Sequence, residues 1–411
     1  MNIWILNHYA ITPDLPGGTR HFDFGRELVK RGYRVTIFSS SFHHSLHKET
    51  KDYKKDSFII EDYEGVKFVW VKTFPYFVNN WRRVVNMLSY SIRVYRIGKT
   101  IDVGKPDIII GSSVHLFSAY IAYLLAKRFK TPFIMEVRDL WPQTLIDMGV
   151  PKWNPFVIIL SILERFLYKK ANKIITLPPR ANEYIERFNI PKNRIVWISN
   201  GVDLTRFNVS SEELIEDKGN NKFVVGYVGS IGLANNIDVA VRAAEILFNN
   251  YPEIKFVFIG DGPEKSKLLK IIKGKNLNNI EFKEPISKKM VPRALSKMDI
   301  LFDCAKDLEL SKYGLSDNKL FDYLASGKPI IFSANSINDP VKEAKAGITI
   351  PPDDPQELAD AIIKLYRLYP KERNEIGING RRYVEKYYSI PILIDKLEEI
   401  IGEVCNMKRL D

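Results

Sequence analysis

Short apolar runs alternate with longer stretches of helical spacing along most of the chain. At the amino end, the apolar run 2–7 precedes a Pro/Gly loop, a helical pattern over 20–31 and a second apolar run at 33–38. This order of strand, helix and strand predicts a parallel sheet. Further strands are expected at 66–71, 107–110, 132–135, 173–177 and 194–198, with helices at 82–100, 116–129 and 155–170.

The alternation stops near an Asn-Gly turn at 199–203 and a polar stretch over 210–222, and then resumes. A chain of 411 residues exceeds the size at which single hydrophobic cores stop growing, so we predict two doubly wound α/β domains. The tail over 383–404 is expected to be a helix interrupted at Pro391. The second set of expected strands is 223–228, 255–259, 280–282, 300–302 and 329–332, with helices at 237–249, 263–272, 288–296 and 355–366.

Composition describes an ordinary globular protein, with 45% hydrophobic and 27% charged residues. The formal net charge of +12 favours an anionic partner, which could be nucleic acid, nucleotide phosphates or an acidic membrane surface. Cys304 and Cys405 are too few for a disulfide framework, which favours a reducing compartment. The longest apolar run, 156–163, is shorter than the roughly 18 residues of a spanning helix, and no cleavable leader precedes 3–6. We therefore expect a cytoplasmic protein.

Polar groups of the amino half collect at the expected ends of strands, where ligands bind in doubly wound sheets. Gly17 and Gly18 would let backbone N–H groups approach an anion, although Gly-Gly also forms plain turns. His115 could donate to a sugar hydroxyl or a phosphate, or could be a satisfied structural histidine. The run from Glu136 to Asp139 holds three ionisable groups, which indicates either a ligand site or a structural ion-pair network.

The stretch 314–331 is the strongest candidate site of the carboxyl half. A helix beginning at Asn318 would present backbone N–H groups and the Lys319 amine to a phosphate, while Asp322 could accept from sugar hydroxyls. An ordinary amphipathic helix with a solvated lysine and aspartate is the alternative. Two glycine loops, 229–232 and 260–262, each follow a strand and indicate a nucleotide cradle.

Two further patterns keep alternative interpretations. His43, His44 and His47 could suggest a metal site, but no cysteine lies nearby and the spacing fits no zinc signature, which favours a loop. The stretches 81–97 and 152–170 mix basic with aromatic and apolar residues. They are either helices that lie on an anionic membrane surface or helices that pack on the sheet with basic outer faces.

Six segments in one order resemble the GT-B glycosyltransferases of family 4, and more narrowly the bacterial surface-polysaccharide branch typified by fucosamine transferases. The resemblance implies two Rossmann-like domains facing across a cleft, with an acceptor-binding domain over 1–200 and a nucleotide-sugar-binding domain over 201–383. A helical tail over 384–411 would pack back on the amino domain. The resemblance spans nearly the whole chain, and its carriers are 17–20 with 27–32, 136–142, 199–203, 228–229, 260–263 and 318–329.

The resemblance also implies roles by position. Lys319 would bind the donor diphosphate, Asp322 the ribose hydroxyls, and His115 would lie near the donor sugar and the acceptor. Gly17 and Gly18 would close over the phosphates. We expect His115, Lys319 and Asp322 to be catalytic, with neither a metal nor a cofactor. The expected substrate-binding residues are Gly17, Gly18, Arg20, Glu136, Arg138, Asp139, Gly229, Ser230, Gly260, Asp261, Gly262 and Asn318.

The chain departs from the wider family pattern at two points. Gly314 and Asp322 stand where the family has two glutamates eight positions apart, and the loop 230–236 lacks the Arg and Lys of many members. The polysaccharide branch resembles this chain at both points, which favours altered donor contacts over an inactive site. Arg138 and Arg20 are the candidates for the missing cation.

The sequence thus predicts a retaining, metal-independent glycosyltransferase of the hexosyltransferase type. It would move a sugar, for example an N-acetylated one, from a UDP-sugar to a lipid-linked or surface-polysaccharide precursor, peripherally at the inner face of the cell membrane. One alternative is a nucleotide-sugar epimerase of the same two-domain fold, which needs no acceptor. Another is a non-catalytic protein that binds sugar nucleotides or nucleic acid. No nucleic-acid-binding motif is present, so we expect no nucleic-acid partner.

Overall fold

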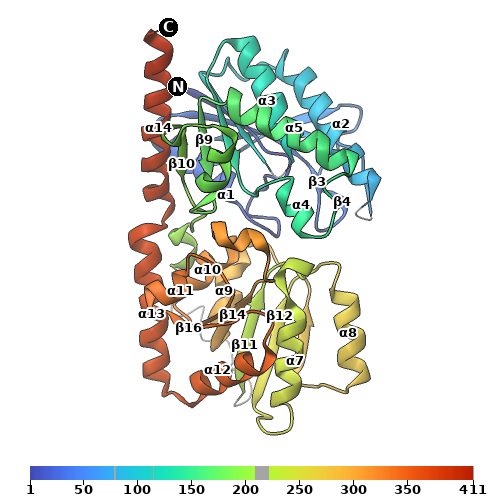
Figure 1. The fold of residues 1–411 in the computed structure, drawn as a ribbon, viewed down its shortest axis with the longest axis vertical. Coiled ribbons are helices and arrows are strands. Elements are labelled where there is room, and N and C mark those ends of the chain that lie inside the picture. Colours follow the sequence, from blue (N-terminus) through green and yellow to red (C-terminus); the bar gives the residue numbers. More distant parts are fainter. Residues whose placement is uncertain (78–79, 114, 209–221, 411) are drawn as a thin grey trace.

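The computed structural model describes residues 1–77, 80–113, 115–208 and 222–410. It contains two α/β domains stacked end to end, each built around one mainly parallel sheet (Figure 1). The predicted fold class of two Rossmann-like domains is confirmed.

The amino domain contains an eight-stranded sheet in the order β10-β9-β8-β7-β1-β2-β6-β5. All neighbours are parallel except β5 and β6, which form a hairpin at the edge. The edge strand β5 is absent from the predicted set, because its alternating half-exposed residues lack a continuous apolar run. The strands are β1 (Asn2–Leu6), β2 (Arg34–Ser40), β5 (Phe58–Tyr63), β6 (Val66–Val71), β7 (Ile108–Ser112), β8 (Phe133–Val137), β9 (Lys173–Thr176) and β10 (Ile195–Trp197), with a separate small hairpin of β3 (Phe42–His43) and β4 (Lys48–Glu49).

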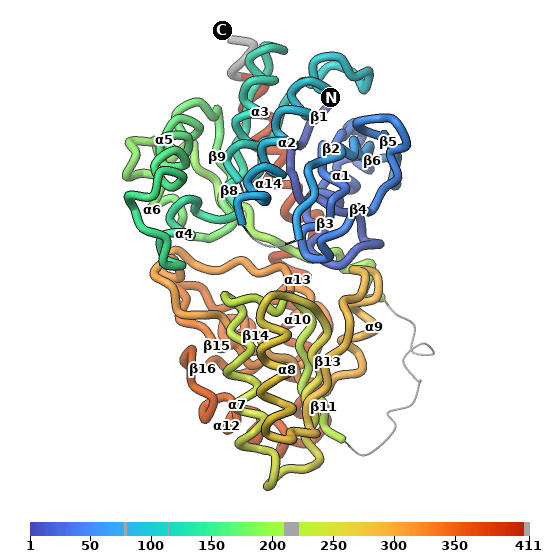
Figure 2. Tube along the Cα trace, turned by 90° about the vertical axis from the view of Figure 1, so that its right-hand side faces the viewer, coloured from blue at the N-terminus to red at the C-terminus, as the bar shows by residue number. Residues whose placement is uncertain are grey.

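Helices cover both faces of this sheet. One face carries α2 (Trp81–Gly98), α3 (Leu116–Phe129) and α5 (Pro155–Lys170), and the other carries α1 (Arg20–Lys30) and α14 (Ile390–Leu410). Figure 2 shows α2 and α3 in front, with α14 behind them. The shorter helices α4 (Gln143–Asp147) and α6 (Ala181–Ile185) complete the domain.

The carboxyl domain has a six-stranded, fully parallel sheet in the order β13-β12-β11-β14-β15-β16. Apolar cores lie on both of its faces, with α7 and α12 on one and α9, α10 and part of α13 on the other. The strands are β11 (Phe223–Val228), β12 (Ile254–Ile259), β13 (Ile280–Lys283), β14 (Ile300–Cys304), β15 (Ile330–Ser333) and β16 (Gly347–Ile350). The helices are α7 (Ile237–Leu247), α8 (Lys265–Gly274), α9 (Val291–Ser296), α10 (Asn318–Ala325), α11 (Pro340–Ala344), α12 (Pro355–Arg367) and α13 (Pro370–Tyr387).

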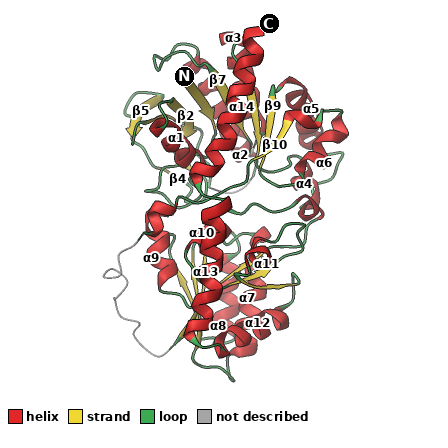
Figure 3. Ribbon diagram, turned by 90° about the vertical axis from the view of Figure 1, so that its left-hand side faces the viewer, coloured by secondary structure: helices red, strands yellow, loops and turns green. Residues whose placement is uncertain are grey.

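The last two helices cross from one domain to the other. Helix α13 ends at Tyr387, and α14 then runs across the amino-domain sheet (Figure 3). The predicted interruption at Pro391 is wrong by a few residues, because Pro391 lies in the first turn of α14, where a missing N–H costs no hydrogen bond. The break lies at Tyr388–Ser389, where the Val202 N–H donates to the Tyr388 carbonyl at 3.0 Å.

Contacts between the domains fix the geometry of the space between them. Arg26 pairs with Asp203 at 2.6 Å, and Arg206 pairs with Asp23. On another side, the Lys288 N–H donates to the carbonyl oxygen of Leu15 at 3.1 Å. Backbone and side-chain contacts therefore hold the carboxyl ends of the two sheets against each other.

Candidate functional site

A cleft of about 400 Å³ lies between the domains and is lined by both of them. It lies at the carboxyl ends of the strands, which is where doubly wound sheets bind ligands. The amino domain contributes Tyr9, Ile11, Pro16, Gly17, Gly18, His44, Ser45, Leu46, Arg83 and Arg138. The carboxyl domain contributes Val228, Gly229, Ser230, Asn235, Ile259, Gly260, Asp261, Pro285, Ile286, Lys288, Val291, Asp317, Asn318, Lys319 and Asp322.

The two glycine loops of the carboxyl domain pack directly on each other. A Cβ at Gly260 would lie 1.9 Å from the carbonyl oxygen of Gly229, so only glycine fits there. The predicted residues Gly229, Ser230, Gly260 and Asp261 all line the cleft. Gly262 is not among the lining residues, and its N–H donates to the Asp261 carboxylate at 2.8 Å instead of to a ligand.

Lys319 lies in the first turn of α10 and faces the cleft. Its amine is 3.0 Å from Asp303, 3.3 Å from Asp317 and 3.0 Å from the Asn235 side-chain oxygen. Burial opposes the charged form, but Asp303 and Asp317 hold the pKa of Lys319 well above its usual range. The amine is therefore a cation at neutral pH, held by two carboxylates at the edge of the cleft.

The amino end of α10 is open toward a ligand. Asp317 is its N-cap residue, yet no side-chain hydrogen bond caps the helix. The first backbone N–H groups and the partial positive charge of the helix end can therefore act on an anion, beside the Lys319 amine.

Asp322 also lines the cleft, but it is engaged by a lysine that the sequence analysis does not single out. The Lys288 amine forms an ion pair with the Asp322 carboxylate, and both side chains are almost completely buried. Asp322 would therefore accept a hydrogen bond from a ligand while its carboxylate is paired with Lys288. Lys288 adds a second cation to the carboxyl-domain wall.

The glycine pair of the amino domain meets α10 across the cleft. A Cβ at Gly18 would lie 2.7 Å from the Asn318 side-chain nitrogen, so the backbone of 17–18 approaches the helix more closely than any larger residue allows. Gly17 has a φ of 129°, in the region that glycine favours. The structure thus brings Gly17, Gly18, Asn318 and Lys319 together.

Of the two candidates for the missing cation, the structure brings only Arg138 to the cleft. Arg20 is buried in the amino domain, where its Nε donates to Glu136 at 2.8 Å and its other nitrogens donate to the carbonyls of Ile198 and Ser199. Arg20 therefore holds the strand end to the interdomain segment and is not available to a phosphate.

Glu136 is the centre of this buried network. It also accepts from His21 at 2.7 Å and from the Ser112 hydroxyl at 2.6 Å. Burial raises the pKa of Glu136, but Arg20 and His21 outweigh it and hold the pKa well below its usual range. At Glu136 the structure contains an ion-pair network, which is the alternative interpretation of 136–139 given in the sequence analysis. Asp139 is exposed and does not line the cleft.

His115 lies behind the cleft wall, and it is buried. As the N-cap of α3 it accepts at Nδ1 from the Ser118 N–H, and its Nε2 is 2.7 Å from Nδ1 of His8. His115 Nε2 is then the proton donor of this pair. Burial lowers the pKa of His115 to about 3, so the ring is neutral at pH 7. Tyr9 is among the residues that line the cleft and His115 is not, so the predicted contact of His115 with the donor sugar stays a prediction.

The other histidines do not form a metal site. His43 is 2.9 Å from the Pro16 carbonyl through Nε2, His44 lines the cleft, and His47 packs edge-on against Tyr76. Within the described part of the chain, no three potential metal-binding side chains gather.

Several cleft residues are absent from the sequence-based set. Asp303, which contacts the Lys319 amine but is not itself a lining residue, is absent as well; it follows an expected strand directly, so the strand-end rule could have found it. Lys288 and Arg83 lie in expected helices and carry no local signal, because their approach to the cleft depends on the packing of distant segments.

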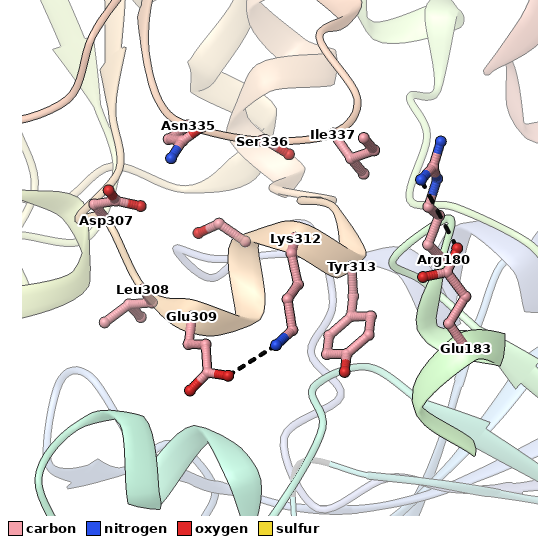
Figure 4. A pocket seen from close by; sticks show the side chains of 11 residues that line it. Arg180, Glu183, Asp307, Leu308, Glu309, Lys312, Tyr313, Asn335, Ser336 and Ile337 are labelled. Atoms are coloured by element: carbon pink, nitrogen blue, oxygen red, sulfur yellow. Dashed lines mark hydrogen bonds and ion pairs between the residues drawn. The ribbon is translucent and has the colours of Figure 1, made fainter. Parts of the chain in front are cut away.

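A second, larger pocket of about 760 Å³ lies beside the loop 307–313 (Figure 4). Four of its five charged side chains are paired with each other, Lys312 with Glu309 at 2.8 Å and Arg180 with Glu183 at 3.8 Å, and the fifth is Asp307. It has no glycine among its lining residues. The smaller cleft is therefore the better candidate site.

Family models match both domains of the chain. The model described as Glycosyltransferase Family 4 matches residues 17–206, and the model described as Glycosyl transferases group 1 matches residues 210–383. This chain belongs to the GT-B glycosyltransferases of family 4. The transferase is 23% identical to an alpha-D-kanosaminyltransferase of Streptomyces kanamyceticus, over 72% of its own chain and 78% of that protein. It is 24% identical to a putative colanic acid biosynthesis glycosyl transferase of Escherichia coli, over 80% and 82% of the two chains.

Solved structures share the fold of the transferase. A sucrose-phosphate synthase from Thermosynechococcus elongatus superposes with a TM-score of 0.73 at 15% identity, covering 98% of each chain. The HepE protein of Anabaena, solved in complex with UDP-glucose, superposes with a TM-score of 0.68 at 13% identity, covering 98% of this chain and all of that one. No helix in the described residues of the transferase is both long and apolar enough to cross a membrane.

Proposed function

We propose that this transferase moves a sugar, with retention of configuration, from a UDP-sugar to a lipid-linked precursor of a surface polysaccharide. The observation that carries the proposal is the Lys319 amine beside the uncapped amino end of α10, opposite Gly17 and Gly18. The kanosaminyltransferase and colanic acid relatives support sugar transfer in glycan or glycoside assembly, and HepE supports a UDP-sugar donor.

The chemistry follows from the charge that develops as the sugar–phosphate bond breaks. The sugar gains oxocarbenium character, and the departing diphosphate gains negative charge. The Lys319 amine and the N–H groups of α10 are aimed at that anion, and such preorganised donors stabilise the transition state more than the ground state. Asp303 and Asp317 hold the amine in place before the donor binds.

A retaining reaction that requires no metal fits the cations that line the cleft. Lys319, Lys288 and Arg138 all line the cleft and can neutralise a diphosphate directly. In a retaining reaction of this kind, the leaving phosphate itself can accept the proton of the attacking acceptor hydroxyl. This route needs no strong general base, and the neutral, buried His115 is consistent with it.

The lipid-linked acceptor is supported by the outer surface of α2, α3 and α5, which we call the apolar–basic face. Together these helices contain nine lysines and arginines and one acidic residue, Glu164, which is buried. An apolar surface with basic residues and no exposed carboxylate fits the headgroup region of an anionic membrane. Its exposed apolar side chains are Trp81, Leu88, Ile92, Ile158, Ile159 and Ile162, and the exposed Trp153 lies just before α5.

The proposal is tested by donor turnover. Thermal-shift screening against UDP-, GDP- and TDP-sugars first identifies the donor, since a bound ligand raises apparent stability. In buffer with EDTA, Lys319→Ala should then lower the turnover number for that donor by about a hundredfold or more, because it removes a donor to the developing anion. Lys342→Ala removes the same charge from the exposed surface of the same domain and should leave turnover unchanged. Unchanged turnover in Lys319→Ala would overturn the proposal.

A further inference from the structure

Arg83 lies where the apolar–basic face meets the cleft. It is in the first turn of α2, two residues after the exposed Trp81, and its side chain lines the cleft together with Tyr9 and His44. Helix α2 covers the outside of the amino domain (Figures 1 and 2), so one helix carries both exposed apolar side chains and a cation at the cleft. A lipid held on this surface would have a charged neighbour at the cleft entrance.

The two walls of the cleft differ in charge. The described lining residues of the amino domain include Arg83 and Arg138 and no carboxylate. In the opposite wall, Lys319 contacts Asp317 and Lys288 contacts Asp322. The carboxyl-domain wall therefore contains both signs of charge, with three carboxylates and two amines, whereas the charged side chains of the amino-domain wall are two guanidinium groups.

The charges of Arg83 and Arg138 act on different, partly overlapping sets of groups. Arg138 acts on Arg20, His21, His44 and Asp139, and Asp139 also interacts with Asp317 beside Lys319. Arg83 acts on His8, Tyr9, His44 and His115, all of them in the amino domain. Both arginines act on His44. The charge of Arg83 therefore acts on the amino-domain wall of the cleft, and Arg138 is linked through Asp139 to Asp317 of the donor wall.

We propose that Arg83 selects an acceptor that carries a diphosphate between its lipid and its first sugar. This inference rests on the proposed transfer to a lipid-linked acceptor. The lipid lies along the apolar–basic face beside Trp81, the Arg83 guanidinium binds the diphosphate, and the acceptor sugar reaches into the cleft toward Lys319. A guanidinium suits this role because its planar fork donates two parallel hydrogen bonds to phosphate oxygens.

The test separates the acceptor diphosphate from that of the donor. Protein saturated with UDP is titrated calorimetrically with farnesyl diphosphate, a soluble lipid diphosphate. Arg83→Gln should weaken farnesyl diphosphate binding about tenfold or more, because it removes a charge-assisted hydrogen bond, and should change the affinity for UDP less than about twofold. Arg83→Lys keeps the charge but loses the planar fork, so its affinity for farnesyl diphosphate should lie between those of the wild type and Arg83→Gln.

The matched control is Arg82→Gln, which removes the same charge from the same turn of α2. Arg82 is exposed and does not line the cleft, so farnesyl diphosphate and UDP should bind this variant as they bind the wild type. Circular dichroism should show the same unfolding temperature for the three variants and the wild type.

Three results would overturn the inference. The first is an equal loss of UDP affinity in Arg83→Gln, which would assign Arg83 to the donor diphosphate. The second is an unchanged affinity of that variant for farnesyl diphosphate. The third is a wild type that binds UDP but does not bind farnesyl diphosphate. A wild type that fails to bind any nucleotide or nucleotide sugar would instead contradict the proposed function.

Discussion

Two buried glutamates of the amino domain show how a single residue's surroundings decide its charge. Glu136 contacts Arg20, His21 and Ser112, which hold its pKa well below the usual range and keep it ionised. Glu164, in contrast, accepts hydrogen bonds from the hydroxyls of Tyr168 and Tyr184 at 2.9 and 3.3 Å. Burial raises the pKa of Glu164 to about 8, so this carboxyl group is mostly protonated at pH 7.

The raised pKa of Glu164 predicts a pH-dependent stability. The folded protein binds this proton more tightly than the unfolded chain, so its contribution is complete below the ordinary glutamate pKa of 4.5 and is lost as the pH rises through about 8. Glutamine has no proton to lose. We expect Glu164→Gln to exceed the wild type in free energy of unfolding by about 1 kcal/mol or more at pH 9, and to show a smaller or no gain at pH 5.

Urea unfolding at the two pH values measures this difference. Glu183→Gln, at an exposed position of the same domain, should show no such dependence. A gain for Glu164→Gln that is equal at pH 5 and pH 9 would mean that this side chain is ionised in the folded protein.

At the scale of single elements, α5 has apolar side chains on its inner and its outer surface. Val157, Leu160 and Leu167 are buried against the sheet, whereas Ile159 and Ile162 are 54% and 67% exposed. A helix of a soluble domain usually has one apolar stripe and a polar opposite side. The sequence alone left packing on the sheet and contact with a membrane as alternatives. The structure shows the packing on the sheet and leaves Ile159 and Ile162 exposed on the outer surface.

The outer surface of α5 predicts binding to anionic vesicles. Ile162→Glu puts a charge into the apolar–basic face, and we expect it to weaken binding to vesicles of phosphatidylglycerol and phosphatidylcholine by about tenfold, with its folding unchanged. The matched control is Ile378→Glu, because Ile378 is 43% exposed on α13 of the carboxyl domain. Co-sedimentation measures both. Equal binding of the Ile162 variant and the wild type would place membrane contact, if any, elsewhere on the molecule.

At the scale of the whole molecule, the carboxyl-terminal helix stabilises the amino domain. Leu393, Leu397 and Ile401 of α14 are buried in the same core as Ile5 and Ile37 of the amino-domain sheet. The residues that complete this core are therefore last in the chain, after the whole of the other domain. We propose that the amino domain folds stably only when α14 covers this face of its sheet.

This arrangement gives a test by tryptophan fluorescence, since all six tryptophans lie between residues 4 and 197. Leu397→Ala leaves a cavity under α14 and should lower the free energy of unfolding of the tryptophan-reported transition by about 2–5 kcal/mol. Leu358→Ala makes a similar cavity in the carboxyl core and should act mainly on the transition seen by circular dichroism. A tryptophan-reported transition that Leu397→Ala leaves unchanged would show that α14 adds nothing to the stability of the amino domain.

The sequence by itself determined the elements and their order. The ends of α3, α5 and β11 agree with the expected ranges, because apolar spacing, glycines and prolines act on the chain within a few residues. Patterns confined to one turn or one loop also predicted Lys319 in the first turn of a helix and the two glycine loops directly after strands, and the structure has them there, with Lys319, Gly229 and Gly260 lining the cleft.

Only the tertiary structure decided which strand-end side chains reach the cleft. Arg20 and Arg138 were equal candidates in the sequence, yet Arg20 is used in a buried network and Arg138 lines the cleft. Lys288 and Arg83 reach the cleft from helices without any local signal. The physical reason is that the partner of a charged group depends on distances between segments more than a hundred residues apart, such as Arg20 and Glu136, and these distances exist only after both domains have packed.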